Sequence, residues 1–98
     1  MANYITLISW TEQGIKSYGS TLDRAEAAAA LAGRFGGSLD NIYWTMGEYD
    51  VVGVLTAPDD ESATAFALAL SSQGNVRTTT MRAFDAHEMR QILAKVAG

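Results

Sequence analysis

Two apolar runs with a short polar break between them form the clearest hydrophobic pattern in the chain, from Ile42 to Ala57. The run before the break is aromatic and the run after it is rich in valine, and both residue types favour strands. Gly47 and Glu48 lie in the break, where a glycine can adopt the positive φ of a tight reversal. The pattern predicts a β-hairpin from about Leu39 to the residue before Pro58, with Gly47 at positive φ.

Three further segments have apolar residues at the spacing of an amphipathic helix, and each begins with a residue that can cap a helix. The first begins at Ser20 and ends at Gly36, and the second begins at the acidic run after Pro58. The third begins at Asp85, which forms the capping-box pattern with Glu88. The residues at helical spacing are Leu22, Ala25, Ala28, Ala29, Ala32 and Phe35 in the first helix and Met89, Ile92, Leu93 and Val96 in the third, which is amphipathic. The expected buried stripe of the second helix is Ala63, Phe66, Ala67 and Leu70.

Residues 4–10 and 76–84 complete the pattern as strands, the first apolar on both faces and the second rich in threonine. Residues 11–14 are expected to form a turn, and residues 15–19 are either a short helical turn or a loop. The element order is therefore β-α-β-β-α-β followed by a helix, in which right-handed crossovers interleave the two strand–helix–strand halves. The predicted class is α+β: one ferredoxin-like domain over residues 1–98, with a four-stranded antiparallel sheet of order 4-1-3-2 and a C-terminal helix.

In this topology both main helices cover the same face of the sheet, and the other face needs a cover of its own. The strand residues Tyr4, Trp10, Tyr43, Trp44 and Met46 are distributed so that neither face can be wholly polar. The C-terminal helix alone is too small to cover the whole sheet. A second copy of the chain is the simplest cover, so we expect a homo-oligomer, either a dimer or a larger assembly, with a water-poor cleft at its interface.

Composition narrows the classes of partner. The chain carries a formal net charge of −4, with only seven Lys and Arg residues and no basic run, which argues against nucleic acid. It has no cysteine, which excludes disulfides, thiol nucleophiles and thiolate metal sites. The N-terminus lacks the pattern of a signal peptide, and no apolar run approaches the ~20 residues of a membrane span. We therefore expect a cytoplasmic protein with no membrane partner.

Few side chains in the sequence can carry chemistry. Tyr49 and Asp50 follow the predicted turn and could present a phenol and a carboxylate to a cleft, although Asp50 could instead fix the turn by accepting backbone N–H groups. His87, the only histidine, falls in the first turn of the last helix, where a partly exposed structural role is favoured over haem ligation. The acids at residues 59–61 fit a helix cap better than a metal site. We expect no metal and no cofactor.

The aromatic residues of the strands are the strongest candidates for a ligand site. An aromatic pocket could be lined by Tyr4, Trp10, Tyr43 and Trp44, with Arg77 as its anion-binding group. Strand aromatics also serve as core or interface residues, so both roles stay open. The candidate ligand-binding residues are Trp10, Tyr43, Trp44, Tyr49, Asp50 and Arg77.

Three segments carry a resemblance to a known family. They are residues 43–52 (YWTMGEYDVV), residues 57–61 (APDDE) and residues 74–80 (GNVRTTT). Together they resemble the GYD-domain family of small bacterial proteins, and Gly47, Tyr49 and Asp50 align with its name motif. The resemblance implies a ferredoxin-like domain similar to the dimeric α+β barrels, in which two sheets face one another. It implies no established activity, since proteins of that architecture include cofactor-free monooxygenases, haem-handling enzymes and small-molecule sensor modules.

These observations leave three hypotheses for function. The leading one is a homo-oligomeric domain that binds a small apolar or aromatic molecule in a cleft at the sheet face. The second is a cofactor-independent enzyme, a monooxygenase or an isomerase, that uses Tyr49, Asp50 or Arg77 in that cleft. The third is an interaction module with no ligand. No residue pattern in the sequence defines a reaction, so a binding role is favoured over an enzyme.

Overall fold

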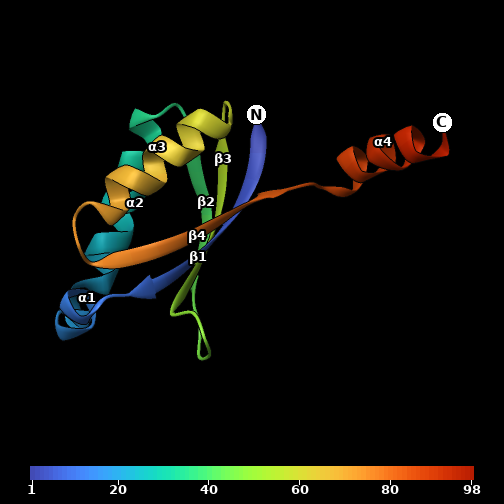
Figure 1. The fold of residues 1–98 in the computed structure, drawn as a ribbon. Helices are drawn as coiled ribbons and strands as arrows, with labels where there is room; N and C mark the ends of the chain where they lie inside the picture. Colours follow the sequence, from blue (N-terminus) through green and yellow to red (C-terminus); the bar gives the residue numbers. More distant parts are fainter.

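The strands form because they are rich in β-branched and aromatic residues, and successive side chains along a strand lie on opposite faces of the sheet. In the computed structural model, which describes residues 1–98, the strands make one antiparallel four-stranded sheet in the order β2-β3-β1-β4. Read from the other edge this is the predicted order 4-1-3-2, so the α+β, ferredoxin-like fold is confirmed (Figure 1). The elements along the chain are β1 (Ala2–Trp10), α1 (Glu12–Lys16), the 3-10 turn η1 (Tyr18–Ser20), α2 (Thr21–Arg34), β2 (Ser38–Trp44), β3 (Val51–Ala57), α3 (Asp60–Ser71), β4 (Val76–Ala83) and α4 (Ala86–Ala97).

Helices α2 and α3 cover one face of the sheet and bury the core against it (Figure 1). The even-numbered residues of β1 and the odd-numbered residues of β3 point into this core, as in the register pair Tyr4–Leu55. The core cluster consists of Tyr4, Leu31, Ala32, Leu55, Ala57, Ala63 and Phe66. The residues at helical spacing in α2 only partly match its buried face, because Leu31 is buried while Leu22 is exposed. All buried residues of α2 lie in its second half, so its first turn contributes little to the core.

Two of the predicted helix starts and one predicted helix end are confirmed. The Asp59 carboxylate accepts the backbone N–H of Ser62 at 2.7 Å, at the start of α3. Asp85 and Glu88 form a complete capping box at the start of α4, with N···O distances of 2.8 and 3.1 Å. Gly36 follows α2 with φ +77°, the left-handed conformation that ends many helices. These local signals therefore fix the boundaries of the elements.

The cap expected at Ser20 is wrong. Its hydroxyl donates to the Ser17 carbonyl oxygen at 2.9 Å and caps no helix N–H, because η1 leads directly into α2 and supplies carbonyl oxygens itself. Residues 11–14, expected as a turn, are the cap and first turn of α1. The Thr11 hydroxyl accepts the backbone N–H of Gly14 at 3.1 Å. The connection from β1 to α2 is therefore helical along most of its length.

The reversal between β2 and β3 does not use glycine as the sequence suggests. Positive φ values occur at Gly36, Gly74 and Gly98, and Gly47 is not among them. The loop of residues 45–50 is closed instead by the Thr45 backbone N–H, which donates to the Asp50 carbonyl oxygen at 2.9 Å. A longer loop spreads the change of direction over several residues, so no single residue needs a left-handed backbone. A Cβ atom at position 47 would have no neighbour within 4 Å, and a side chain there causes no strain.

A β-bulge interrupts β2. Leu39 pairs with Leu55 and Asn41 pairs with Val54, so Asp40 is the extra residue between them. Because one extra residue reverses the alternation of a strand, Leu39 and Trp44 both face the helices although their numbers differ in parity. The bulge thereby decides which face of the sheet receives Trp44.

The other face of the sheet has no helix over it, and we call it the open face (Figure 1). Its apolar residues are half-buried or exposed, and they are Ile5, Leu7, Tyr43, Val52, Val54, Met81 and Ala83. The sequence argument for an apolar open face named partly the wrong residues. Tyr4, Trp10 and Trp44 lie on the helix-covered face and Met46 lies in the loop after β2, so only Tyr43 of that set is on the open face.

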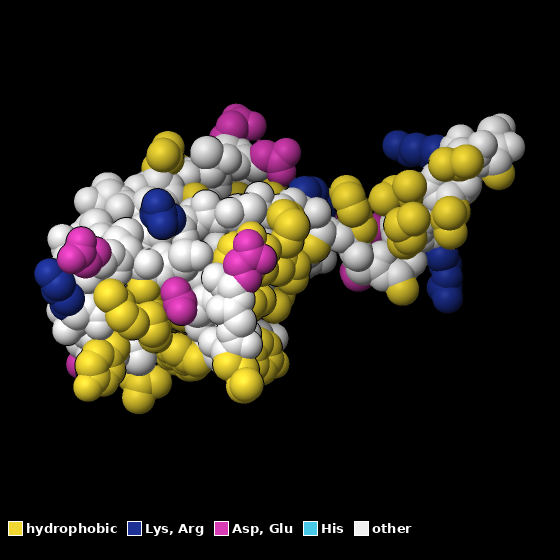
Figure 2. All heavy atoms as spheres, turned by 60° about the horizontal axis from the view of Figure 1, so that its bottom comes forward, with side chains coloured by type: hydrophobic (Ala, Val, Ile, Leu, Met, Phe, Trp, Pro, Cys, Tyr) yellow, Lys and Arg dark blue, Asp and Glu magenta, His cyan; other side chains and the backbone are white.

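Residues 84–98, which we call the C-terminal arm, extend away from the body of the protein (Figure 1). The arm contains α4, in which no residue is buried. Its apolar side chains gather along the arm in Figure 2, and Phe84, Met89, Leu93 and Val96 are all exposed. No helix in the structure has the length and apolar character that crossing a bilayer requires. The arm therefore presents an amphipathic helix with no apolar surface of its own chain beneath it.

Candidate functional site

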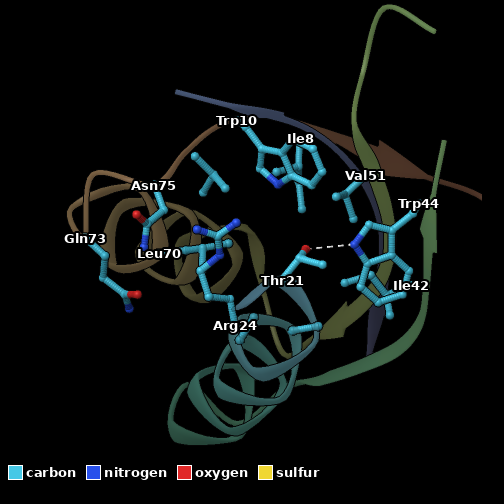
Figure 3. Close-up of a pocket in the computed structure, with 13 residues that line it drawn as sticks. Ile8, Trp10, Thr21, Arg24, Ile42, Trp44, Val51, Leu70, Gln73 and Asn75 are labelled. Atoms are coloured by element: carbon cyan, nitrogen blue, oxygen red, sulfur yellow. Dashed lines mark hydrogen bonds between the residues drawn. The ribbon is translucent and has the colours of Figure 1, made fainter. Parts of the chain in front are cut away.

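An apolar cleft lies between the helix-covered face of the sheet, the first half of α2 and the end of α3 (Figure 3). We call it the tryptophan pocket, because both tryptophans of the chain line it. It encloses about 50 Å³, room for a few water molecules. Its lining residues are Ile8, Trp10, Thr21, Arg24, Ala25, Ala28, Ile42, Trp44, Val51, Leu70, Gln73, Asn75 and Val76. One protomer therefore has a cleft without help from a second copy.

Trp10 and Trp44 reach the pocket from the ends of β1 and β2, on either side of β3. The Trp44 indole Nε1–H donates to the Thr21 hydroxyl oxygen at 2.8 Å, which links the end of β2 to the first turn of α2 (Figure 3). Trp44 is 40% exposed, so it stands at the rim of the pocket. Large flat side chains that stay partly exposed beside an apolar cleft are suited to contact a ligand.

Asp50 positions Trp10 and does not enter the pocket. Its carboxylate accepts the Trp10 backbone N–H at 2.8 Å, and its own N–H donates to the Ile8 carbonyl oxygen at 2.9 Å. Through these bonds Asp50, the residue before β3, extends the pairing between β3 and β1. The neighbouring Tyr49 is half-buried, and its carbonyl oxygen accepts the Thr45 hydroxyl at 2.5 Å. The Asp50 carboxylate therefore accepts a backbone N–H group, as in the structural role considered for this residue.

The structure separates the remaining candidate residues from the tryptophans. Arg77 pairs with Ser9 and Tyr43 pairs with Val52, and all of these side chains belong to the open face. The sheet itself therefore lies between them and the tryptophan pocket. His87 is exposed in the first turn of α4. Of the six residues proposed for the site, only Trp10 and Trp44 line one cleft.

Arg24 is the site residue that the sequence reasoning missed. It lies on α2, and its Nη1 donates to the Gly14 carbonyl oxygen at 3.1 Å. Its Nη2 is buried and has no hydrogen-bond partner. Arg24 precedes the buried residues Ala28 and Leu31 at the i, i+4, i+7 spacing of one helix face. A charged residue on an otherwise apolar helix face is the sequence signal that could have identified Arg24 as a site residue.

The base of the pocket is held by contacts between α1 and the loop before β4. The Thr11 backbone N–H donates to the Asn75 carbonyl oxygen at 3.0 Å, and the Thr11 hydroxyl donates to the Gly74 carbonyl oxygen at 2.5 Å. The Gln13 side-chain amide donates to the Gln73 carbonyl oxygen at 3.1 Å and to the Asn75 side-chain oxygen at 2.9 Å. Because Gln73 and Asn75 line the pocket, these bonds fix one of its walls.

A second, more polar cleft lies between α3 and β4. Tyr4 is one of its lining residues, and the Tyr4 hydroxyl donates to the Asp60 carboxylate at 2.5 Å. The Arg82 guanidinium stands 5.6 Å from the centre of the Tyr4 ring. Burial, reinforced by the hydrogen bond to Asp60, raises the pKa of Tyr4 from 10.0 to about 12. The Tyr4 hydroxyl and the Asp60 carboxylate are bonded to each other, and most of the lining residues are polar, so we do not place the site for an apolar ligand here.

The Tyr4 pKa predicts how stability depends on pH in alkaline solution. Unfolded Tyr4 ionises near pH 10 and folded Tyr4 near 12, so the contribution of the neutral phenol is complete below pH 10 and is lost as pH rises toward 12. Tyr4→Phe has no phenol to ionise and should lose less stability over that interval. Urea midpoints of both proteins at about pH 9 and about pH 11 measure this. Equal losses in the two proteins would contradict the prediction.

The fold and the pocket define the class as a ferredoxin-like α+β domain with an apolar cleft under its helices. No group of three or more His, Cys, Asp and Glu side chains lies close enough together to hold a metal ion. The GYD domain family matches residues 4–93, and the chain belongs to this family. A comparison with curated protein sequences finds no match.

Solved structures with the same fold are distant in sequence. The crystal structure of TTHA0845 from Thermus thermophilus has 23% identity and a TM-score of 0.58, covering 88% of this chain and 96% of that one. The leucine response regulatory protein LrpA of Mycobacterium tuberculosis has 13% identity and a TM-score of 0.59, covering 87% of this chain. The similarity spans about half of LrpA, at 51% of its chain. At these identities the likeness establishes the fold alone.

Proposed function

We propose that the protein is a homo-oligomeric domain that binds a small apolar or aromatic molecule in the tryptophan pocket. The observation that carries the proposal is the convergence of Trp10 and Trp44, from two different strands, on one apolar cleft. Indole rings offer large flat surfaces on which another ring can stack or meet edge to face. The side chains of Ile8, Ile42 and Val51 add aliphatic walls.

The size of the pocket limits the ligand. Its volume of about 50 Å³ is well below that of a typical drug-sized site and below the ~150 Å³ of a cavity that holds benzene, so a ligand with one ring must also occupy the open rim. Trp44 is held at the rim by one hydrogen bond to Thr21, and rotation of its side chain after that bond breaks would enlarge the entrance. A ligand of this size would exchange water at the rim for contacts with both indoles.

Self-association is proposed from two apolar surfaces that one chain leaves uncovered. The open face carries a central band of aliphatic residues, among them Ile5, Leu7 and Val54, with no helix over it. The C-terminal arm carries an amphipathic helix with no buried residue. In a twofold dimer the open faces of the two copies would pack against each other, and the C-terminal arm of each copy would lie on its partner. Each copy would then cover the apolar surfaces that the other leaves exposed. Removing these surfaces from water supplies the driving force.

Titration with phenylacetamide, a neutral ligand with one ring, tests the binding proposal. The chain contains two tryptophans and both line the pocket, so their indole N–H signals in NMR spectra report on it directly. We expect both signals to shift saturably, and Trp44→Leu to weaken binding by about tenfold through the lost ring contact. Tyr43→Leu changes an aromatic residue of the same strand on the open face and should leave the affinity unchanged. An absence of saturable shifts in the wild-type protein would contradict the proposal.

A further inference from the structure

The guanidinium group of Arg24 is an unusual component of an otherwise apolar pocket. Figure 3 shows it pointing in among the lining side chains. One nitrogen, Nη1, is held by the Gly14 carbonyl oxygen, while Nη2 is buried without a partner. The molecule has two ion pairs, Lys16–Glu12 and Arg82–Glu88, and neither involves Arg24. Its charge is therefore unpaired within the protomer.

An unpaired buried donor is costly, and an unpaired charge costs more, so most such groups have a partner of opposite charge. None of the residues that line the pocket is Asp or Glu, so the protein supplies no such partner there. The bond from Nη1 to Gly14 fixes the direction of the group, since α1 is itself anchored to the loop before β4. The charge is thus held in place and directed at the cavity.

We propose that the ligand of the tryptophan pocket is a small carboxylate with an aromatic or branched aliphatic body, whose carboxylate binds Nη2 of Arg24. This inference rests on the proposed function and assigns the chemical class of its ligand. The body of the ligand lies between Trp10 and Trp44, and its carboxylate lies at the Arg24 end. Guanidinium groups match the planar geometry of carboxylates and form hydrogen bonds strengthened by charge.

The pocket favours a carboxylate over a phosphate for two reasons. A phosphate carries more oxygens than a single buried nitrogen can satisfy, and the remaining walls are mostly apolar. A carboxylate is also small and flat enough for the enclosed part of the pocket, about 50 Å³, while the body of the ligand lies toward the rim. The small-molecule partner is therefore an arylacetate-like or branched-chain acid rather than a phosphorylated compound.

Comparing phenylacetate with phenylacetamide tests the inference, because the two differ only in the charged group. By the NMR titration described above, we expect wild-type protein to bind phenylacetate about tenfold or more tightly than the amide. Arg24→Gln should remove this preference, so that the variant binds phenylacetate no more tightly than phenylacetamide. Arg77→Gln removes an arginine from the open face and should keep the preference intact.

The wild-type protein offers a second measurement that does not depend on a variant's folding. The side-chain N–H signals of Arg24 should shift with phenylacetate and not with phenylacetamide. Equal affinity for the two compounds, with no shift at Arg24, would overturn the carboxylate assignment and leave small-molecule binding standing. Binding of neither compound would overturn both proposals. Retention of the preference in Arg24→Gln would also overturn the role of Arg24.

Discussion

Leu7→Lys is expected to convert the proposed dimer into a folded monomer. Leu7 lies in the middle of the open face, paired with Val52 on one side and Thr79 on the other. In a sheet-to-sheet interface a lysine at this position would bring an unpaired charge into a water-poor layer. We expect the dissociation constant to rise on the order of a hundredfold or more. Sedimentation at micromolar concentration distinguishes the two states.

Ala29→Lys is the matched control for this experiment. It adds the same charge at an exposed position of α2, on the other side of the sheet, and should leave the dimer unchanged. Removal of the C-terminal arm, residues 84–98, should weaken association without unfolding the sheet, because no residue of α4 is buried in the protomer. A wild-type protein that sediments as a monomer at micromolar concentration would contradict the proposed interface. Unchanged association of Leu7→Lys would place the interface elsewhere.

Gly14→Ala is expected to destabilise the protein by about 2–3 kcal/mol. A Cβ atom at this position would overlap with the Asn75 carbonyl oxygen, a backbone atom that cannot move without its loop. Moving α1 away would break the bond from the Thr11 N–H to that oxygen. It would also displace the Gly14 carbonyl oxygen that holds Arg24. The variant should therefore lose stability and binding of phenylacetate together.

The free energy of unfolding from urea denaturation measures the loss of stability. Gly33→Ala is the control, since a Cβ atom there has no neighbour within 4 Å and alanine favours a helix. It should raise stability by up to about 1 kcal/mol, the opposite sign. An unchanged midpoint in Gly14→Ala would mean that α1 and the loop before β4 adapt without strain.

The fold could be predicted because most of its signals are local. The local signals are the β-branched and aromatic runs of β1 and β3, the capping acids Asp59 and Asp85, and Gly36, and each acts within a few residues. The prediction that Gly47 has a positive φ was wrong, although it too was based on a local signal. A glycine permits a positive φ but does not require it, and the length of the loop decided that none was needed.

The site was harder to predict because it depends on register and on contacts between distant segments. Alternation separates Tyr43 from Trp44, but only the bulge at Asp40 decides which of them faces the helices. Arg77 and Arg24 look equally available in the sequence. What distinguishes them is the Gly14 carbonyl oxygen, whose place beside Arg24 is fixed by the packing of α1 on the loop before β4.

The alternation of β1 also has a consequence for how relatives of this protein can diverge. Even-numbered positions such as Ile8 and Trp10 face the pocket, and odd-numbered positions such as Ile5 and Leu7 face the open side. Point substitutions can therefore change ligand preference and self-association separately, within one strand. Insertion or deletion of a single codon in β1 would exchange the two rows and alter both properties in one step. Length in β1 is expected to vary less among family members than the identity of its residues.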